Sequence, residues 1–375
     1  MKNKFIKSLT SITCLGLISV LLLTSPLATI KARAASYAVT PANGVLLTGN
    51  GAEIFTDANP ATCINTVRAN IPVQVTGQTT NGYWQVNIAG STYYMHGTSL
   101  SMQQNTTALK QTSFDAKAAL LMNVKTGQPI YAQGILDKVE PASTAKIMTV
   151  LLVVEAIEAG TISLDTPVVA SATALASLPS DASHMDPKIQ VGEVLTVDQL
   201  LTAVMVSSDC QACNVLAELI AGSVPAFANL MNTRAAQIGC TNTNFTNPSG
   251  YPDKNMYTNA YSLYLITATA IGHPIFNQYF GTQSTVLAPS SMVGPRPLVN
   301  TNSLLDPASI YYNPAVFAGK TGTANRAGQC LVCVANQGGK TEIGIIMGAK
   351  NRTLYDGSKV SMRYYEMNRL LNLGK

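Results

Sequence analysis

Histidine is scarce in this chain, and its scarcity limits the catalytic mechanisms that the sequence can support. Among 375 residues there are three histidines, His96, His184 and His273. A Ser-His-Asp hydrolase needs a histidine as the general base beside its nucleophile. His96 lies in a region with a β pattern, and neither of the others belongs to a recognisable catalytic pattern. A histidine-dependent triad is therefore not expected.

An excess of one charge sign is also lacking once the first residues are set aside. Residues 1–34 contain five of the 24 basic residues and no acidic residue. The remaining part, about 340 residues long, has 19 basic and 19 acidic residues. A neutral chain gives no electrostatic reason to expect nucleic acid or an anionic membrane as a partner. Its length suits two domains.

The first 34 residues have the pattern of a signal peptide. Lys2, Lys4 and Lys7 precede an apolar core at 12–23, and Ala32-Arg33-Ala34 supplies a small-x-small cleavage site. This pattern predicts export, with cleavage near Ala34 and a location outside the cell or in its wall. The alternative is a retained membrane anchor, which the cleavage site and the lack of a second long apolar run disfavour.

Six cysteines remain after such cleavage: Cys63, Cys210, Cys213, Cys240, Cys330 and Cys333. Two Cys-x-x-Cys pairs raise the possibility of zinc. However, Cys330 and Cys333 lie in a strand-like run, where residues an odd number apart point to opposite faces. We therefore expect buried free thiols or one disulfide, and no metal or other cofactor.

The region 38–102 has an all-β pattern. Residues 84–88 alternate apolar and polar, a second short run follows at 91–95, and Asn81-Gly82 precedes them as a turn. Short, closely spaced strands predict a small barrel. The polar segment 103–111 is predicted to be a linker.

The region 112–375 mixes strands and helices. Strand-like runs are predicted at 118–124, 129–132 and 343–348, and helices at 145–159, 196–205, 213–220 and 360–371. The helix at 145–159 is apolar nearly all round and is therefore expected to be buried. Strands at both ends of the region, with helices between them, predict an α/β domain with one sheet built from both ends.

Ser143 and Lys146 form a candidate nucleophile and base. Residues three apart at a helix start share a face, so the lysine can reach the serine hydroxyl. A lysine whose pKa is lowered by burial or a second cation can act as the base. A lone Ser-x-x-Lys is weak evidence, because the same spacing occurs in ordinary solvated helix starts.

The tripeptide Lys-Thr-Gly occurs twice. The copy at 125–127 lies in a predicted turn between two strands, where turn geometry alone explains it. The copy at 320–322 runs into a strand-like stretch, 323–332. There Gly322 would allow a substrate backbone to approach closely, and Lys320 would supply a positive charge for a carboxylate.

These motifs occur together in a known family. Ser-x-x-Lys, Ser-Asp-Asn and Lys-Thr-Gly characterise penicillin-binding proteins and serine β-lactamases, and here the second motif is Ser208-Asp209-Cys210. With the segments 140–149, 244–250 and 319–332, the chain from about residue 114 onward resembles serine-type D-Ala-D-Ala carboxypeptidases, the low-molecular-mass penicillin-binding proteins. The resemblance implies a serine-β-lactamase-like fold, a five-stranded sheet covered by helices.

The resemblance also implies roles for the motif residues. Ser143 would attack the carbonyl of the penultimate D-alanine of a peptidoglycan stem peptide, Lys146 would act as its base, and Ser208 would relay a proton to the leaving amine. Water would then hydrolyse the acyl-enzyme. Penicillin and other β-lactams would acylate the same serine.

On the Lys-Thr-Gly strand, Lys320 and Thr321 would hold the terminal carboxylate of the substrate, beside Gly322. The backbone N–H groups of Ser143 and Thr323 would form the oxyanion hole. Loss of one such donor typically lowers the rate by about 100- to 1000-fold.

One position departs from the family pattern. Cys210 stands where the family has asparagine, and a thiol is a weaker donor and acceptor than an amide. Catalytic efficiency, substrate choice or redox sensitivity could therefore differ. Asn214, one helical turn further on, is a candidate substitute for the missing amide, and Arg352 is a candidate additional carboxylate ligand.

The segment 70–97 resembles a bacterial SH3-like domain, a module that often binds cell-wall peptide. Tyr83, Trp84, Tyr93 and Tyr94 are expected either to line a ligand groove or to pack in the domain core. Three other functions stay open: a β-lactamase, a D,D-endopeptidase or transpeptidase using the same acyl-enzyme, and a non-catalytic wall-binding protein.

Overall fold

The structure, a computed structural model, describes residues 39–48, 52–58, 61, 63–67, 72–88, 91–96, 100–101, 113–176, 178–353, 357 and 359–375. The predicted signal peptide and the predicted linker at 103–111 lie outside the described residues. The chain divides into two compact units, and the boundary along the chain falls between Met102 and Gln103.

The N-terminal unit contains one seven-stranded sheet. Its strands are β1 (Val39–Thr48), β2 (Ala52–Phe55), β3 (Cys63–Val67), β4 (Pro72–Thr79), β5 (Tyr83–Ile88), β6 (Ser91–His96) and β7 (Leu100–Ser101). They pair in the order β3-β2-β6-β5-β4-β1-β7, and each recorded pair is antiparallel. The predicted turn at Asn81-Gly82 joins β4 to β5, with Gly82 at a φ of 88°. Alternate apolar residues of these strands, among them Val75, Val86 and Met95, form the core.

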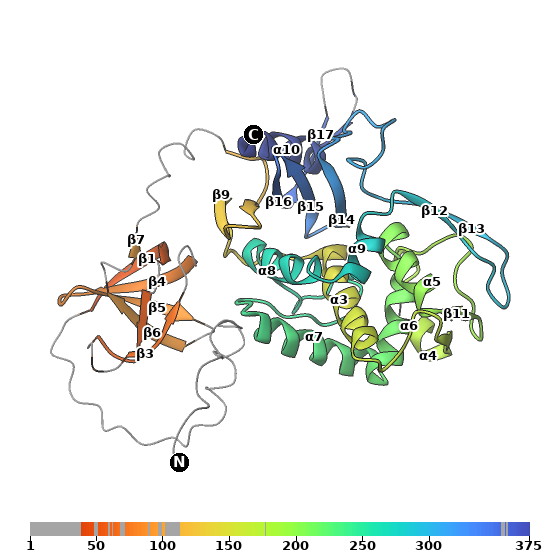
Figure 1. Ribbon diagram of the computed structural model, residues 1–375, viewed down its shortest axis with the longest axis horizontal. Helices are drawn as coiled ribbons and strands as arrows, with labels where there is room; N and C mark the ends of the chain where they lie inside the picture. Colours follow the sequence, from red (N-terminus) through yellow and green to blue (C-terminus); the bar gives the residue numbers. More distant parts are fainter. Residues whose placement is uncertain are drawn as a thin grey trace, which may run out of the picture. The chain divides into compact units, whose positions relative to one another are not determined.

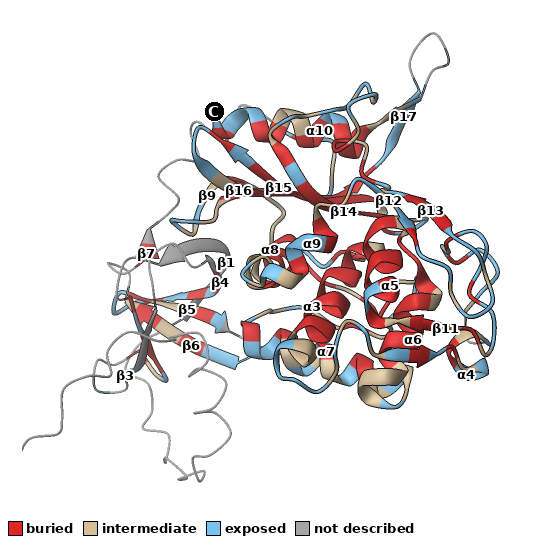
Figure 2. Cartoon of the chain, turned by 45° about the vertical axis from the view of Figure 1, so that its right-hand side comes forward, coloured by how far each residue is buried: buried red, intermediate tan, exposed pale blue. Residues whose placement is uncertain are grey.

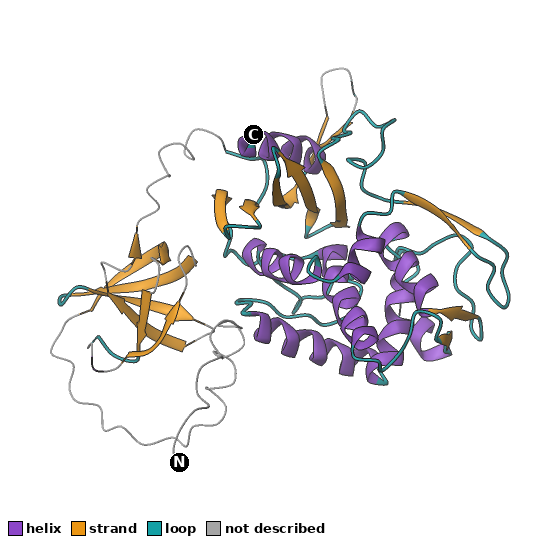
Figure 3. Ribbon diagram, in the orientation of Figure 1, coloured by secondary structure: helices purple, strands orange, loops and turns teal. Residues whose placement is uncertain are grey.

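A second sheet belongs to the larger unit and lies between α10 and most of the other helices (Figures 1 and 3). Its order is β14 (Val316–Ala324), β15 (Gly328–Gln337), β16 (Lys340–Ala349), β8 (Ala118–Asn123), β9 (Gln128–Gln133). Strands from both ends of the region thus join in one five-stranded antiparallel sheet, as the sequence predicts.

Both faces of this sheet are covered, which explains why β8 is a continuous apolar run rather than an alternating one. Figure 1 shows α10 (Met362–Leu371) on one side and α3 (Lys146–Glu158), α8 (Ala260–Ala270) and α9 (Pro274–Phe280) on the other. Close contact with α10 depends on Gly344, where a Cβ would lie 2.6 Å from Met367 Sδ. The buried residues of the unit concentrate along these interfaces (Figure 2).

Additional helices surround α3. They are η3 (Ala142–Ala145), α4 (Ala172–Ala176), α5 (Val197–Thr202), η4 (Ala203–Ser207), α6 (Cys210–Ala221) and α7 (Val224–Ile238). Three small antiparallel ribbons complete the unit: β10 (Pro167–Val169) with β11 (Val194–Thr196), β12 (Ser284–Leu287) with β13 (Arg296–Val299), and β17 (Asn351–Thr353) with β18 (Lys359–Ser361). The chain ends in a short η5 (Asn372–Gly374).

Three sequence-based boundaries were wrong. The stretch 323–332 is not one strand but a hairpin, because β14 ends at Ala324 and β15 begins at Gly328, whose φ of 69° suits a turn. The helix predicted at 196–205 is α5 followed by the π-helical turn η4. The last helix begins at Met362, after β18.

Among the described residues, no single helix is both long and apolar enough to cross a membrane. The pair α6 and α7 meets the criteria only when the two are taken together, and it is bent by 80°.

Candidate active site

The candidate nucleophile lies where a 3-10 turn meets a buried helix. Ser143 is in η3 and Lys146 is the first residue of α3, so the two side chains share a face. Lys146 Nζ lies 2.9 Å from Ser143 Oγ. Ser143 is half-buried, whereas Lys146 is completely buried. The serine is therefore open to a substrate, and its neighbouring lysine is shielded from water.

The backbone just before Ser143 is strained. Ala142 has a φ of 47°, in the left-handed region that residues with a Cβ rarely adopt. Gly250 packs against it so closely that a Cβ there would lie 1.8 Å from the Ala142 carbonyl oxygen. A glycine is required at this position, and the segment 247–250 thereby supports the nucleophile turn.

All three hydrogens of the Lys146 ammonium group have acceptors. Besides Ser143 Oγ, Lys146 Nζ donates to the Ser249 carbonyl at 2.7 Å and to Cys210 Sγ at 3.4 Å. An ammonium group has three donors, so the lysine head is fixed in position. Ser249 belongs to the Asn-Pro-Ser-Gly segment, and the sequence alone predicted no role for this residue.

The second Lys-Thr-Gly copy lies against the nucleophile turn. A Cβ on Gly322 would lie 3.0 Å from the Pro141 carbonyl oxygen and 3.1 Å from the Ser143 nitrogen. Strand β14 therefore packs against η3 at the motif glycine. The close approach of a substrate backbone to Gly322 stays a prediction. Thr321 Oγ1 forms a hydrogen bond with Thr301 Oγ1.

Lys320 is completely buried on β14, and its Nζ donates to the Thr321 carbonyl at 3.2 Å. Burial, followed by the nearby positive charge of Lys146, lowers the pKa of Lys320 to about 7. An incoming carboxylate would favour the protonated form, because an opposite charge stabilises it.

The Ser-Asp-Cys motif forms the turn between η4 and α6. Ser208 is buried with a φ of 64°, and Asp209 caps α6 by accepting a 2.8 Å hydrogen bond from the Ala212 N–H. Burial raises the pKa of Asp209, although its backbone hydrogen bonds act in the opposite direction. Cys210 is the first residue of α6, and its Sγ lies 3.4 Å from Lys146 Nζ. The Ser-x-x-Lys and Ser-Asp-Cys motifs thus meet at Lys146.

Arg363 is a residue of this region that sequence reasoning missed. From α10 its Nη1 donates to the Gly322 carbonyl at 2.9 Å and its Nη2 to Thr323 Oγ1 at 2.6 Å. Burial lowers the pKa of this guanidinium group. No local motif marks Arg363, because its role arises only when α10 packs behind β14.

Two sequence candidates have other partners. The Asn214 amide donates to the Ala174 carbonyl at 2.9 Å, and Arg352 pairs with Asp115 at 3.0 Å on the exposed ribbon β17. Neither observed contact involves a motif residue.

Five cysteines of the larger unit are free thiols: Cys210, Cys213, Cys240, Cys330 and Cys333. Within the described ranges, no three His, Cys, Asp or Glu residues are placed to hold a metal ion.

A sheet flanked by helices, with a Ser-x-x-Lys pair at its Lys-Thr-Gly edge strand, defines the penicillin-binding-protein class of serine enzymes. Comparison with known proteins makes the assignment specific. The family model for D-alanyl-D-alanine carboxypeptidase matches residues 104–351, so the chain belongs to this family.

Individual relatives agree with the assignment. The chain is 32% identical over 235 residues to D-alanyl-D-alanine carboxypeptidase DacF of Bacillus subtilis, which covers 63% of this chain and 58% of that protein. Penicillin-binding protein 5 of Haemophilus influenzae is 29% identical, with a TM-score of 0.60, over 70% of this chain and 71% of the other. A mutant of a Streptomyces DD-transpeptidase is 26% identical, with a TM-score of 0.61, over 70% of this chain and 99% of the other. The chain spans 58% and 62% of the length of the first two curated relatives that it matches.

Proposed function

We propose that the protein is a serine-type D-Ala-D-Ala carboxypeptidase that removes the terminal D-alanine from peptidoglycan stem pentapeptides. The observation that carries this proposal is the 2.9 Å contact between Lys146 Nζ and Ser143 Oγ. It supplies a nucleophile with its own base, and family membership supplies the substrate class.

In the proposed reaction, Lys146 takes the proton of Ser143, whose Oγ attacks the penultimate D-alanine carbonyl. The N–H groups of Ser143 and Thr323 bind the oxyanion, while Lys320 and Thr321 hold the terminal carboxylate. Ser208 passes a proton to the departing D-alanine, and water then releases the shortened peptide. The close packing at Gly322, where a Cβ would lie 3.1 Å from the Ser143 nitrogen, supports this arrangement, because it brings β14 beside Ser143.

β-Lactams are proposed to acylate the same Ser143. Transpeptidation uses the same acyl-enzyme with an amine in place of water, and the likeness to a Streptomyces DD-transpeptidase favours it as a second candidate activity.

For the N-terminal unit we propose an SH3-like fold that binds the cell wall after export of the protein. Its seven short antiparallel strands support this proposal. Tyr83 and Tyr93 are buried and contribute to packing, whereas Trp84 and Tyr94 are half-buried. The last two residues are therefore the better candidates for a ligand surface. The export itself is proposed from the pattern of residues 1–34.

The test is release of D-alanine from a pentapeptide ending in D-Ala-D-Ala. The parent chain and Ser284→Ala, which changes an exposed serine of β12, are expected to release it at equal rates. Ser143→Ala is expected to lower the rate by at least about 1000-fold. Unchanged release by Ser143→Ala would contradict the proposed nucleophile, and no release by the parent chain would contradict the proposed activity.

A further inference from the structure

The proposed reaction leaves one nucleophilic side chain of the site without a role. Cys210 Sγ lies 3.4 Å from Lys146 Nζ, and Lys146 Nζ lies 2.9 Å from Ser143 Oγ. The thiol thus contacts Lys146, and Lys146 contacts Ser143, the residue proposed to react with substrate. A second thiol, Cys213, follows three positions later on α6.

We propose that Cys210 is a site of thiol–disulfide exchange that takes small disulfides, and that Cys213 resolves the product into an intrachain disulfide. The effect of this exchange on acylation rests on the function proposed above for Ser143.

The surroundings of Cys210 are those in which protein thiols react. It is the first residue of a helix, it contacts a lysine, and it begins a Cys-x-x-Cys pair. Each of these three features independently favours reactive cysteines. Only 3% of Cys210 is exposed. Its Sγ contacts Lys146 Nζ, which in turn contacts Oγ of the half-buried Ser143, so a small molecule that reaches the serine comes within one side chain of the thiol.

Cys213 has the character of a resolving thiol. It is completely buried, its Sγ donates to the Asp209 carbonyl at 3.1 Å, and burial raises its pKa. Such a thiol is a poor first nucleophile, but it lies one helical turn from Cys210 and is therefore the candidate to attack a disulfide formed there.

The helix geometry requires a small adjustment for this bridge. Cβ atoms three residues apart on a helix are about 5–6 Å apart, and a disulfide needs about 3.5–4.5 Å. Cys210 is in the first helical turn, where its N–H has no acceptor within the helix. It donates instead to the Ser183 carbonyl at 2.8 Å, and the adjustment has to lengthen this bond.

The exchange balances in two steps. The Cys210 thiolate attacks one sulfur of a small disulfide, forms a mixed disulfide and releases one small thiolate. The Cys213 thiolate then attacks Cys210 Sγ, forms the intrachain disulfide and releases the second small thiolate. The two protons lost by the cysteines go to the released thiolates, and the small disulfide accepts the two electrons.

The other cysteines lack this combination of features. Burial raises the pKa of Cys330 to about 11 and that of Cys240 to about 12, and it raises that of Cys333 as well. Cys63 is exposed and lies on β3, in the other unit of the chain. A selective reaction at Cys210 is therefore distinguishable from general oxidation.

Exchange at Cys210 is expected to block acylation. A mixed disulfide would place its small group beside Lys146, and the intrachain disulfide would draw Sγ away from the ammonium group. Either product disturbs the lysine that positions Ser143, and small displacements of catalytic groups lower rates strongly.

The experiment treats the reduced full chain with 2-hydroxyethyl disulfide, traps the remaining thiols with N-ethylmaleimide and maps the cysteines by mass spectrometry. The expected result is a peptide with Cys210 and Cys213 joined before the other four cysteines react. Fluorescent penicillin labelling of Ser143 should fall by about tenfold and return after reduction with dithiothreitol.

Three variants sharpen the result. Cys213→Ser should stop at the mixed disulfide on Cys210 and still lose labelling. Cys210→Ser should show the same penicillin labelling of Ser143 before and after the disulfide treatment, however strongly it is labelled before the treatment. Cys63→Ser, which changes a cysteine outside the catalytic unit, should behave as the parent chain does.

Free thiols at Cys210 and Cys213 after Cys63 has reacted would overturn the proposal. A formed bridge with unchanged labelling would overturn its effect on acylation. If even the reduced chain is not labelled, the function proposed for Ser143 is wrong, and the cysteine map still decides whether exchange occurs at Cys210.

Discussion

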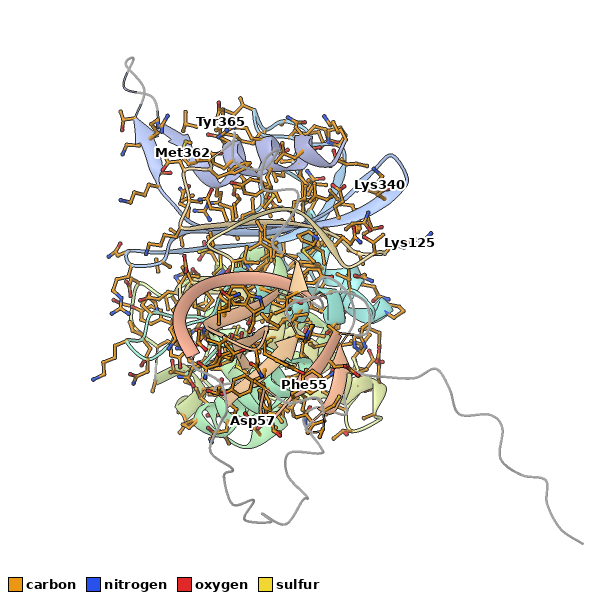
Figure 4. The ribbon with its side chains drawn as sticks, turned by 90° about the vertical axis from the view of Figure 1, so that its left-hand side faces the viewer. Phe55, Asp57, Lys125, Lys340, Met362 and Tyr365 are labelled. Carbon is orange, nitrogen blue, oxygen red and sulfur yellow. The ribbon has the colours of Figure 1, made fainter. Side chains whose placement is uncertain are left out.

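The tripeptide Lys-Thr-Gly occurs twice in this chain, and its two copies have opposite surroundings. The first, Lys125–Gly127, forms the turn between β8 and β9, where Lys125, labelled in Figure 4, and Thr126 are exposed. The second lies on β14, where Lys320 is completely buried and Thr321 is 6% exposed. Identical residues therefore serve as a solvated turn in one region and as part of a proposed active site in the other.

The two glycines show the difference in physical terms. Gly127 has a φ of 64°, and nothing lies within 4 Å of the position its Cβ would take. Glycine is needed at this position because its backbone adopts a positive φ, which residues with a Cβ rarely adopt. At Gly322 a Cβ would lie 3.0 Å from the Pro141 carbonyl oxygen. Glycine is needed there because the turn with Ser143 leaves no room for a side chain. The comparison shows that a short motif acquires a role from what it touches.

The largest expected difference lies between the two lysines. Lys320→Ala should lower kcat/KM for a D-Ala-D-Ala peptide by about 100- to 1000-fold, because it removes the proposed carboxylate charge from a water-poor site. Lys125→Ala should leave kcat/KM unchanged. Steady-state D-alanine release measures both, and equal effects would mean that the two copies are not distinguished by their surroundings.

Replacing each glycine with alanine should lower activity at one copy of the motif and stability at the other. Gly322→Ala should lower kcat/KM by about tenfold, because its Cβ pushes η3 and Ser143 away by a few tenths of an ångström. Gly127→Ala should keep full activity but lose about 1 kcal/mol of unfolding free energy, because alanine is strained at a positive φ. Urea unfolding and D-alanine release measured on both variants check these two expectations. Lost activity in Gly127→Ala together with full activity in Gly322→Ala would refute them.

The pH dependence should reflect the burial of Lys320. With its pKa lowered to about 7, the free enzyme loses this charge above neutrality, so KM should rise about fivefold between pH 7 and pH 8. The unfolded chain has the ordinary lysine pKa of 10.5 and binds more protons in that interval. The Lys320 contribution to unfolding free energy therefore increases from pH 7 toward pH 10.5.

Lys320→Met tests this sign, since the unfolding free energy of the parent chain minus that of the variant should increase between pH 7 and pH 9. Parallel stability curves for the two proteins would contradict a lowered pKa at Lys320. Lys125→Met, at the exposed copy, is the matched control and should follow the parent curve.

The smallest expected effect concerns the support behind the second copy. Arg363→Lys retains the charge but cannot reach both the Gly322 carbonyl and Thr323 Oγ1. We expect about a threefold decrease in kcat/KM from a looser β14. Arg352→Lys, which alters an exposed ion pair with Asp115, should have no effect. A decrease for Arg352→Lys alone would instead favour the carboxylate role that the sequence suggested for that arginine.

Much of the larger unit was predictable because its elements are marked locally. The buried run at the start of β8, the apolar helix α3 ending before Gly160, and the turn at Lys125–Gly127 were all predicted near their observed positions. The β14–β15 hairpin was missed although Asn325 and Arg326 lie between the two strands and Gly328 begins β15, a combination typical of a turn. The π-helical end of α5 was missed because it departs from regular helix periodicity.

By itself the sequence determined the family, the motif order and the pairing of Ser143 with Lys146, because spacing along one helix start fixes which side chains share a face. Only the tertiary structure decided which Lys-Thr-Gly copy meets the turn with Ser143, that Cys210 contacts Lys146, and that Arg363 supports β14 from α10. Those contacts join residues far apart in sequence. They depend on packing between elements, which no local pattern encodes.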